Sequence, residues 1–396
     1  MRISTNQMFR QGFDAIARQQ NEVVAAQQQV ATGRRFSTPA QDPSGAARAL
    51  DLRGAISVNE QHRAVAASAN TRLVVQEQAL AASENVLQRI REIALQATSS
   101  TLTQTDRDAL AAEVDARFNE LLGLANTKDA NGEFLFAGNK TNTQPFTQGA
   151  SVSYNGDQGA RELEIAPGFR VNVSHPGDVV FAGFLGGNGA FTTSANTANT
   201  GSGLIGPGTV LDPGTYSGQA FVINFTTATT YEVRDNTNAL VHSGSYVSGQ
   251  DITFGGIAVS VSGTPNANDQ FSVAGSQTQS VFDTVTELSA ALRAPSVAPE
   301  QQALVFNRLG SVVGNVDQAQ AQLSGVRARV GAQMNVVDSQ LLVAEDFSVQ
   351  LQTALSDVEN VDLAQAVTRL NQRLVSLEAA QRSFAAVQGL SLFNYL

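Results

Sequence analysis

The sequence contains no cysteine among its 396 residues, so a disulfide framework, a thiolate nucleophile and a cysteine-based metal site are all excluded. Its first residues lack the long apolar stretch and small-residue cleavage site of a secretory signal. No later stretch reaches the roughly 18 uncharged apolar residues of a membrane helix. We therefore expect neither cleaved-signal secretion nor a membrane-spanning segment.

Lysine is also scarce, since it occurs only at positions 128 and 140, and the formal net charge is -10. A chain of this charge repels phosphate backbones and anionic headgroups, so we expect no nucleic acid and no membrane partner. Apolar residues make up 42% of the chain and charged residues 15%, which is typical of a soluble protein that can bury a core. The length allows two or three domains.

Three composition zones follow one another along the chain. Residues 1–127 and 278–396 are rich in Ala, Gln, Leu and Val, whereas residues 140–275 are rich in Gly, Thr, Ser and Asn. The first composition favours long helices and the second favours short strands. We predict a mainly α fold with a β insert: long antiparallel amphipathic helices from both termini form a coiled-coil bundle, and a central antiparallel β-rich domain lies between them in sequence. The predicted domains are 1–40 with 360–396, 41–139 with 277–359, and 140–276.

Both ends of the chain carry apolar residues spaced by three or four positions, as in a coiled-coil seam. Glutamines at positions 20, 27 and 381 interrupt these seams, so two such helices alone would be marginal. We expect the terminal helices to pack on each other and on further copies of the chain. The packing residues predicted are Met8, Phe9, Phe13, Ile16, Val23, Val30, Leu363, Val367, Leu370, Leu374, Leu377, Phe384, Leu392, Phe393, Tyr395 and Leu396.

Further seams predict the inner helices. The predicted seam residues are Ala66, Ala69, Leu73, Leu80, Leu87, Ile90 and Ala94, then Val114, Phe118, Leu121 and Leu122, and finally Val316, Ala319, Leu323, Val326, Val330 and Val337. Glycines and prolines between residues 33 and 45 predict a loop, after which Asp42 or Ser44 can cap a helix. Thr105 or Asp106 can cap the next helix, and Asp362 the last.

The insert predicts antiparallel hairpins. Residues 231–235 and 239–244 alternate apolar and polar side chains around an Asn-Thr-Asn turn, and Gly255 and Gly256 mark a tight turn within 252–261. The Gly-, Asn- and Thr-rich stretch 183–208 predicts a loop. Within it, residues 201–206 match G-x-G-x-x-G, but no apolar strand precedes the motif and Pro207 follows where a helix should begin.

Catalytic constellations are missing from the sequence. His62, His175 and His242 lie far apart without metal-ligand spacing, and the calcium-like run at 128–134 lacks the bidentate glutamate. Glu162 and Glu164 alternate along a predicted strand, where paired carboxylates are usually solvated. We therefore predict no catalytic, metal or cofactor site, and a protein that is not an enzyme.

Four stretches, MRISTNQMF, TGRRFSTPAQDPSGAARAL, LANTKDANGEFLFAGNKTNTQPF and SLFNYL, resemble the bacterial flagellin superfamily. The third resembles the hook-filament junction branch more than filament flagellins. We name the residues that carry it the junction-type motif: Phe134, Phe136, Gly138, Pro145 and Phe146. The second stretch contains the family-motif loop: Gly33, Arg34, Pro39, Asp42 and Pro43. One departure is Gln41, where the family usually has a second acidic residue.

The resemblance implies a structural adaptor that joins the flagellar hook to the filament, assembled as a ring of subunits. Its implied partners are further copies of the chain, the first hook-associated protein, flagellin and an export chaperone at the C-terminal region. It also implies an extracellular flagellar location, reached by type III export without a cleaved signal. The alternatives are a filament-forming flagellin and a binding module displayed on a helical stalk, the latter suggested by the β insert.

Overall fold

The computed structural model describes residues 5–389. Its helices are α1 (Thr5–Thr32), α2 (Pro43–Ala97), α3 (Gln104–Ala125), α4 (Gly177–Phe181), α5 (Val281–Arg293), α6 (Pro299–Glu359) and α7 (Leu363–Gly389). All of the strands lie between α3 and α5, within the described residues. The predicted class, mainly α with a central antiparallel β region, is confirmed.

The chain forms two compact units, one of residues 1–64 with 340–396 and one of residues 65–339. Helices α2 and α6 each contribute residues to both units. The predicted division into three domains has different boundaries and stays a prediction.

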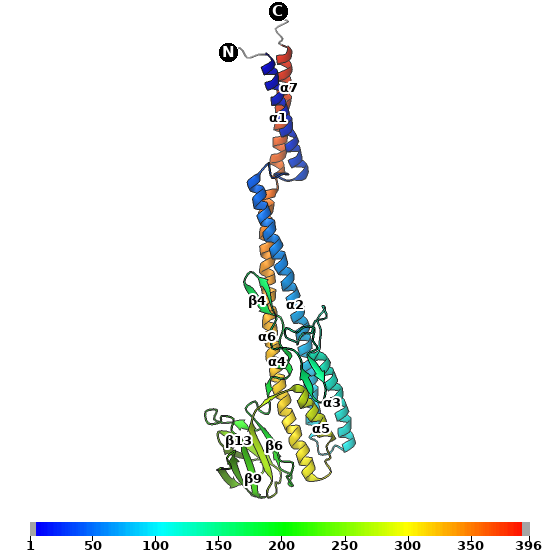
Figure 1. Ribbon diagram of the computed structural model, residues 1–396, viewed down its shortest axis with the longest axis vertical. Coiled ribbons are helices and arrows are strands. Elements are labelled where there is room, and N and C mark those ends of the chain that lie inside the picture. Colours follow the sequence, from blue (N-terminus) through cyan, green and yellow to red (C-terminus); the bar gives the residue numbers. More distant parts are fainter. Residues whose placement is uncertain (1–4, 390–396) are drawn as a thin grey trace, which may run out of the picture. The chain divides into compact units, whose positions relative to one another are not determined.

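In the first unit, α1 and α7 run side by side (Figure 1). The rings of Phe9 and Phe384 meet edge to face with centroids 6.1 Å apart, and Arg373 pairs with Glu22 at 2.5 Å. Since α1 begins where α7 ends, the two helices are antiparallel. The predicted packing of the N-terminal and C-terminal helices is confirmed.

The inner seams are buried as predicted. On α2, the predicted seam residues from Ala66 to Ala94 are at most 1% exposed. The predicted seam residues of α6, from Val316 to Val337, are buried to the same extent. The polar members Gln76 and Ser83 are fully buried, and Ser83 donates its hydroxyl to the carbonyl of Ala79 at 2.8 Å. Across α2 and α6, Arg327 pairs with Glu77 at 2.6 Å. Buried apolar side chains therefore hold α2 and α6 together. Charged side chains such as Arg327 and Glu77 pair at the edge of this contact.

The helix caps follow the prediction at two of three positions. Asp362 caps α7 by accepting the backbone N–H of Ala364 at 2.9 Å. Helix α3 begins one residue earlier than expected, because Thr103 is the N-cap and forms a capping box with Asp106. The prediction of Thr105 as a cap was wrong, whereas Asp106 takes part as the acidic residue of the box.

The strands form a small sandwich, two separate hairpins and one short pair of strands that are distant in sequence. They are β1 (Phe146–Gln148), β2 (Val152–Tyr154), β3 (Glu162–Ala166), β4 (Phe169–Asn172), β5 (Phe184–Leu185), β6 (Phe191–Ala195), β7 (Leu204–Ile205), β8 (Thr209–Val210), β9 (Phe221–Thr227), β10 (Thr230–Asp235), β11 (Leu240–Ser245), β12 (Asp251–Phe254), β13 (Ile257–Ser262), β14 (Gln270–Gly275) and β15 (Thr278–Gln279). A five-stranded sheet, in the order β11-β10-β9-β14-β6, shares one apolar core with a four-stranded sheet, in which β13 pairs with β12, β7 and β8.

Both predicted hairpins are present. Strands β10 and β11 pair antiparallel, as do β12 and β13 around Gly255 and Gly256, whose φ angles are 52° and 82°. The turn needs both glycines because L-residues rarely adopt positive φ. The prediction that 183–208 is only a loop was wrong, since β6 is a sheet strand that buries Phe191. The single buried aromatic gave too little alternation to identify the strand.

Candidate functional site

The terminal helices expose much of the apolar surface that the sequence assigns to packing. Twelve of the 22 large apolar side chains exposed among the described residues belong to the smaller unit of 1–64 with 340–396. Phe13 is 67% exposed, whereas Val23 is buried in the seam. Six of the twelve lie on α1 and α7, namely Phe13, Val24, Leu363, Val367, Leu374 and Val375. A helix pair with this many exposed apolar side chains is typical of a surface that other chains cover.

The predicted packing residues divide into three groups. Phe9, Ile16, Val30, Leu370, Leu377 and Phe384 are half-buried, and Leu363, Val367 and Leu374 are exposed. The side chain of Met8 and all of Leu392, Phe393, Tyr395 and Leu396 lie outside the described residues. The α1–α7 contact therefore brings together part of the predicted set and leaves another part on the surface.

The family-motif loop joins α1 to α2 beside the turn that joins α6 to α7. Gly33 ends α1 with a φ of 68°, the left-handed conformation usual after a helix. Arg34 and Asn360 form an antiparallel bridge, in which the N–H of Val361 donates to the carbonyl of Gly33 at 2.9 Å. Backbone hydrogen bonds thus connect the α1–α2 loop to the α6–α7 turn. Pro39 is an exposed turn residue.

Asp42 is the N-cap of α2, as predicted. Its carboxylate accepts the N–H of Gly45 at 2.8 Å, and Pro43 takes the first helical position. The hydrogen bond from Gly45, helped by Arg35 at 2.5 Å, lowers the pKa of Asp42 to about 2. Gln41 also has a local role, because its amide oxygen accepts the N–H of Ser37 at 2.7 Å. An amide oxygen can make this contact, so the loop does not need an acid there.

The junction-type motif lies in the second unit and contributes to its core. Phe136 and Phe146 are at most 2% exposed, and Phe134 is 9% exposed. The Phe146 ring lies 5.1 Å from that of Phe282 on α5 and 5.7 Å from that of Phe181 on α4. The motif therefore packs against two helices, α4 and α5. Because its aromatic residues are buried, we interpret them as core residues.

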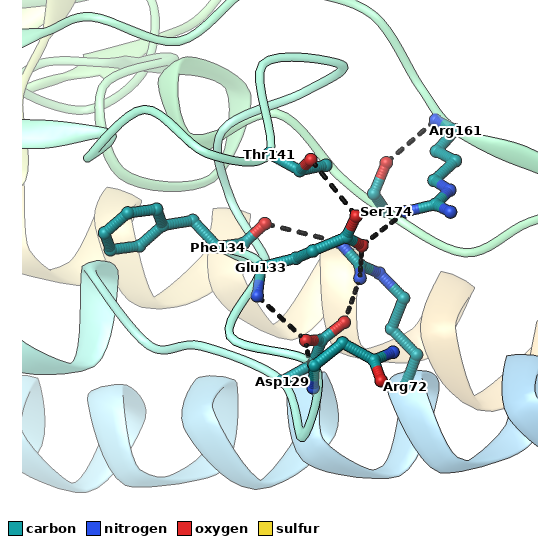
Figure 2. A network of polar contacts seen from close by, with 8 residues as sticks. Arg72, Asp129, Glu133, Phe134, Thr141, Arg161 and Ser174 are labelled. Atoms are coloured by element: carbon teal, nitrogen blue, oxygen red, sulfur yellow. Dashed lines mark hydrogen bonds and ion pairs between the residues drawn. The ribbon is translucent and has the colours of Figure 1, made fainter.

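Figure 2 shows a polar network beneath this motif, centred on the buried guanidinium of Arg72 from α2. Arg72 binds the carboxylate of Asp129, lies 3.1 Å from Glu133 and donates to the carbonyl of Phe134 at 3.3 Å. Arg161 reaches Glu133 at 2.5 Å from the β side. The network anchors the segment after α3 to α2, and the sequence analysis missed it entirely.

Gly138 occupies a place that no other residue fits. Its φ is 68°, and a Cβ there would lie 2.2 Å from a carboxylate oxygen of Asp157 and 2.3 Å from its carbonyl. Asp157 is held in place because its carboxylate accepts the N–H of Asn139 at 2.8 Å. The turn that follows Phe136 therefore depends on glycine.

We expect Gly138→Ala to destabilise the unit of 65–339 by about 2 to 3 kcal/mol, because the residue would add a steric clash to the strain of positive φ. Thermal unfolding followed by circular dichroism measures the loss. Gly132→Ala is the matched control: its φ is 81° but nothing lies within 4 Å of its Cβ position, so it carries the strain alone. Equal losses for the two variants would contradict the steric explanation.

His175 is mostly buried beside the α2 seam. Its Nδ1 lies 3.1 Å from the amide nitrogen of Gln76, which is fully buried. Burial lowers the pKa of His175 to about 4, and the positive charge of Arg329 acts in the same direction. The imidazole is therefore a neutral packing residue at neutral pH.

We expect His175 to make stability depend on pH. The unfolded chain takes up a proton on this ring near pH 6.5, whereas the folded chain does so only near pH 4. Stability contributed by the neutral ring is therefore complete above pH 6.5 and is lost as the pH falls toward 4. Denaturant midpoints at pH 7 and pH 4.5 should differ less for His175→Gln than for the parent. An NMR titration that places this ring near pH 6.5 would contradict the prediction.

Two asparagines of α6, which the sequence analysis did not identify, hold the strand region to the helix. The side-chain oxygen of Asn307 accepts the N–H of Ile205 at 2.8 Å, and its amide donates to the carbonyl of Gly203 at 3.0 Å. Asn315, which is 1% exposed, accepts the N–H of Gly187 at 2.7 Å. Because their partners are more than a hundred residues away, no local pattern reveals them.

The remaining chemical motifs stay separate in the structure. Within residues 5–389, no group of three or more histidine, aspartate or glutamate side chains is placed to hold a metal ion. Glu162 and Glu164 are exposed on β3, and Glu164 lies 3.6 Å from Arg170 on β4. The G-x-G-x-x-G stretch contains β7 and pairs with β13.

Helix length and polarity also bear on the membrane question. None of the helices described here is both long enough and apolar enough to cross a membrane.

Two family models match the helical parts of the chain. The bacterial flagellin N-terminal helical region matches residues 3–141, and the bacterial flagellin C-terminal helical region matches residues 313–396. The two matched regions contain the terminal helices, the family-motif loop and three of the five residues of the junction-type motif. Its last two residues, Pro145 and Phe146, follow the first match.

Individual relatives are similar to this chain over different lengths. Flagellar hook-associated protein 3 of Escherichia coli (strain K12) is 29% identical over 181 residues, which are 46% of this chain and 57% of that protein. The chain thus spans little more than half the length of the curated relatives it matches. Among solved structures, FlgL of Xanthomonas campestris is 36% identical with a TM-score of 0.73, over 77% of this chain and 99% of that one. Hook-associated protein 3 of Legionella pneumophila is 27% identical with a TM-score of 0.74, over 78% and 98%.

Proposed function

The chain belongs to the family of flagellar hook-associated protein 3, also named FlgL, and on this premise we propose that it is a structural adaptor that joins the flagellar hook to the filament. The observation that carries the proposal is the α1–α7 pair, which brings both ends of the chain together and still exposes Phe13, Val367 and Leu374. A subunit of this kind completes its burial only when it assembles.

The energetics favour assembly over an isolated terminal pair. Ordering a helix costs roughly 1 to 2 kcal/mol per residue in backbone entropy. Contact with neighbouring chains stabilises the ordered helix by about 25 cal/mol for each Å2 of apolar surface that is covered. The narrow α1–α7 seam covers little surface by itself, so neighbouring chains supply the remainder. We infer that the terminal helices are held most firmly in the assembled state.

The proposal includes partners and a location. The chain would form a ring of its own copies, contact the first hook-associated protein on one side and flagellin on the other, and be held before assembly by an export chaperone at its C-terminal region. It would act outside the cell after type III export without a cleaved signal. The role is structural, and the residues of 1–40 with 360–396 would form the inner part, with 140–276 outermost.

Deletion of a terminal helix tests the adaptor role. Removing residues 1–30 or 362–396 should leave the unit of 65–339 folded, because its core contains none of these residues. A bacterium that depends on the deleted protein should then make hooks without attached filaments, scored by electron microscopy. Deleting 236–238, the β10–β11 turn, is a control that should keep filaments attached. Normal attachment after either terminal deletion would refute the adaptor role.

Seeded assembly separates the adaptor from a filament-forming flagellin. Purified protein added to short filament fragments should cap or bind them without growth. Long polymers of this chain alone would instead favour the flagellin alternative.

A further inference from the structure

The α1–α7 pair has two different flanks. The two helices meet along a seam marked by the buried Val23 and Ala26 of α1. Helical spacing places Phe13 and Val24 on one side of that seam and Ala15 on the other. Each flank is therefore a separate surface with its own shape.

One flank, which we call the projecting flank, carries large apolar side chains. They are Phe13 at 67% exposure, Val24 at 53%, Val367 at 42% and Leu374 at 41%. Val367 and Leu374 stand on the same side as Phe13, since they lie opposite Ser383 around α7 and Ser383 lines the other flank. None of the four has a seam partner that covers it within the described residues.

The other flank, which we call the grooved flank, contains a hollow of about 380 Å3. Its lining consists of Gln11, Gly12, Ala15, Ile16, Ala380, Ser383 and Phe384. The lining is mostly apolar and contains no charged residue. Small side chains make the hollow, and Gly12 lets the ring of Phe384 approach α1 so closely that a Cβ would lie 2.6 Å from it.

The two surfaces stand at the same height along the helices. Phe13 lies in sequence between Gly12 and Ala15, which line the groove, but it points to the opposite flank. A copy placed beside another at the same level would therefore bring the Phe13 ring of one to the groove of the next. The groove lining and the four apolar side chains of the projecting flank carry no charge, so the inserted Phe13 ring meets an uncharged surface.

We propose that Phe13 of one copy inserts into the groove of a second copy, so that terminal pairs associate side by side in one direction. A surface that binds itself closes as a dimer, whereas two unlike surfaces on opposite flanks continue to a chain or close as a ring. The contact rests on the proposed adaptor function and names the surfaces by which its subunits meet.

The absence of cysteine allows a direct cross-linking test with the full-length protein. Ala17→Cys, which lies one turn from Phe13 on the projecting flank and keeps its ring, and Ser383→Cys are prepared as separate single variants, mixed, and treated with a short bismaleimide. We expect mixed pairs that join position 17 to position 383, and few pairs from either variant alone. Val375→Cys is the matched control, because it is 66% exposed on the outer side of α7 and lies on neither flank.

Three results would overturn the contact. The first is an excess of pairs that join position 17 to itself, which would mean a face-to-face dimer. The second is an equal yield from Val375→Cys, or no cross-link at all. The third is a cysteine at 383 that stays protected in a monomer at every concentration, because a segment of the same chain would then occupy the groove.

Two substitutions test the fit from opposite sides. Phe13→Ala removes the inserted ring, and Ala15→Phe fills the groove from an exposed position. Each should weaken self-association by at least about tenfold in sedimentation experiments, as loss of a central aromatic anchor does. Val375→Ala should leave it unchanged. Circular dichroism checks that the helices remain, and unchanged association in both variants would contradict the insertion.

A bacterium lacking its own junction protein separates this contact from the adaptor function. In cells that carry the Ala17→Cys/Ala379→Cys double variant, which keeps Phe13 and the groove lining and places each cysteine one turn away on the same flank, cross-linking should give a ladder of oligomers while filaments stay attached. Attached filaments without a ladder would refute the contact alone. A ladder with purified protein but no attached filaments would refute the adaptor function alone.

Discussion

Replacing Arg72 with methionine is expected to destabilise the unit of residues 65–339 by about 3 to 5 kcal/mol. The side chains of Arg72 and Asp129 are only 7% and 8% exposed, so the substitution leaves a buried carboxylate without its counter-charge. Glu133 keeps its contact with Arg161 at 2.5 Å, and the penalty therefore falls mainly on Asp129. The segment that leads into the junction-type motif would lose its anchor to α2.

Tyrosine fluorescence during denaturant unfolding measures this loss. The chain has no tryptophan, and four of its five tyrosines belong to residues 65–339. Arg117→Met is the matched control, because Arg117 pairs with Glu120 at 2.7 Å on an exposed part of α3 and such pairs contribute about 0.2 to 1 kcal/mol. A loss of the same small size for Arg72→Met would mean that the network stabilises nothing.

A double substitution tests the cause. If the uncompensated carboxylate accounts for the penalty, adding Asp129→Asn to Arg72→Met should recover part of the lost stability. Asp129 also accepts the N–H groups of Asn131 at 2.9 Å and Glu133 at 3.0 Å, contacts that an asparagine oxygen can keep. Additive losses from the two substitutions would show that they act independently.

Phe146→Ala is the second large effect, with an expected loss of about 3 to 5 kcal/mol. The ring is 2% exposed and lies among Phe181, Phe282 and Tyr154, with centroids 5.1 to 5.7 Å away. Alanine would leave a cavity where α4, α5 and the first strand meet, and these elements cannot close it without moving apart elsewhere. The segment before β2 would become less protected.

Calorimetry and amide exchange check the effect of Phe146→Ala. The unfolding temperature should fall by several degrees, and the amides of 146–154 should exchange faster. Phe146→Leu should recover most of the loss, since it refills much of the cavity. Phe169→Ala serves as a control, because that ring is 44% exposed on β4 and should change stability little. Similar losses for Phe146 and Phe169 would contradict a core role for the motif.

Local signals predicted much of this protein. The seven-residue spacing of Leu73, Leu80 and Leu87 predicted the buried seam of α2, because side chains two helical turns apart share a helix face whatever they pack against. Asp42 and Asp362 were predicted as caps because their carboxylates bond backbone N–H groups only two or three residues away. The Gly255-Gly256 turn is equally local.

The tertiary structure decided what depends on residues far apart in sequence. Arg72 meets Asp129 across 57 residues, and Asn307 meets Ile205 across 102, so neither partner could be chosen before the elements were placed. The apolar stripe of α1 was predictable, but its division into a seam, the exposed Phe13 and the groove beside Ala15 required the position of α7. Periodicity determines which residues share a face of one helix, whereas only the packed pair determines which face is covered and which remains open to another chain.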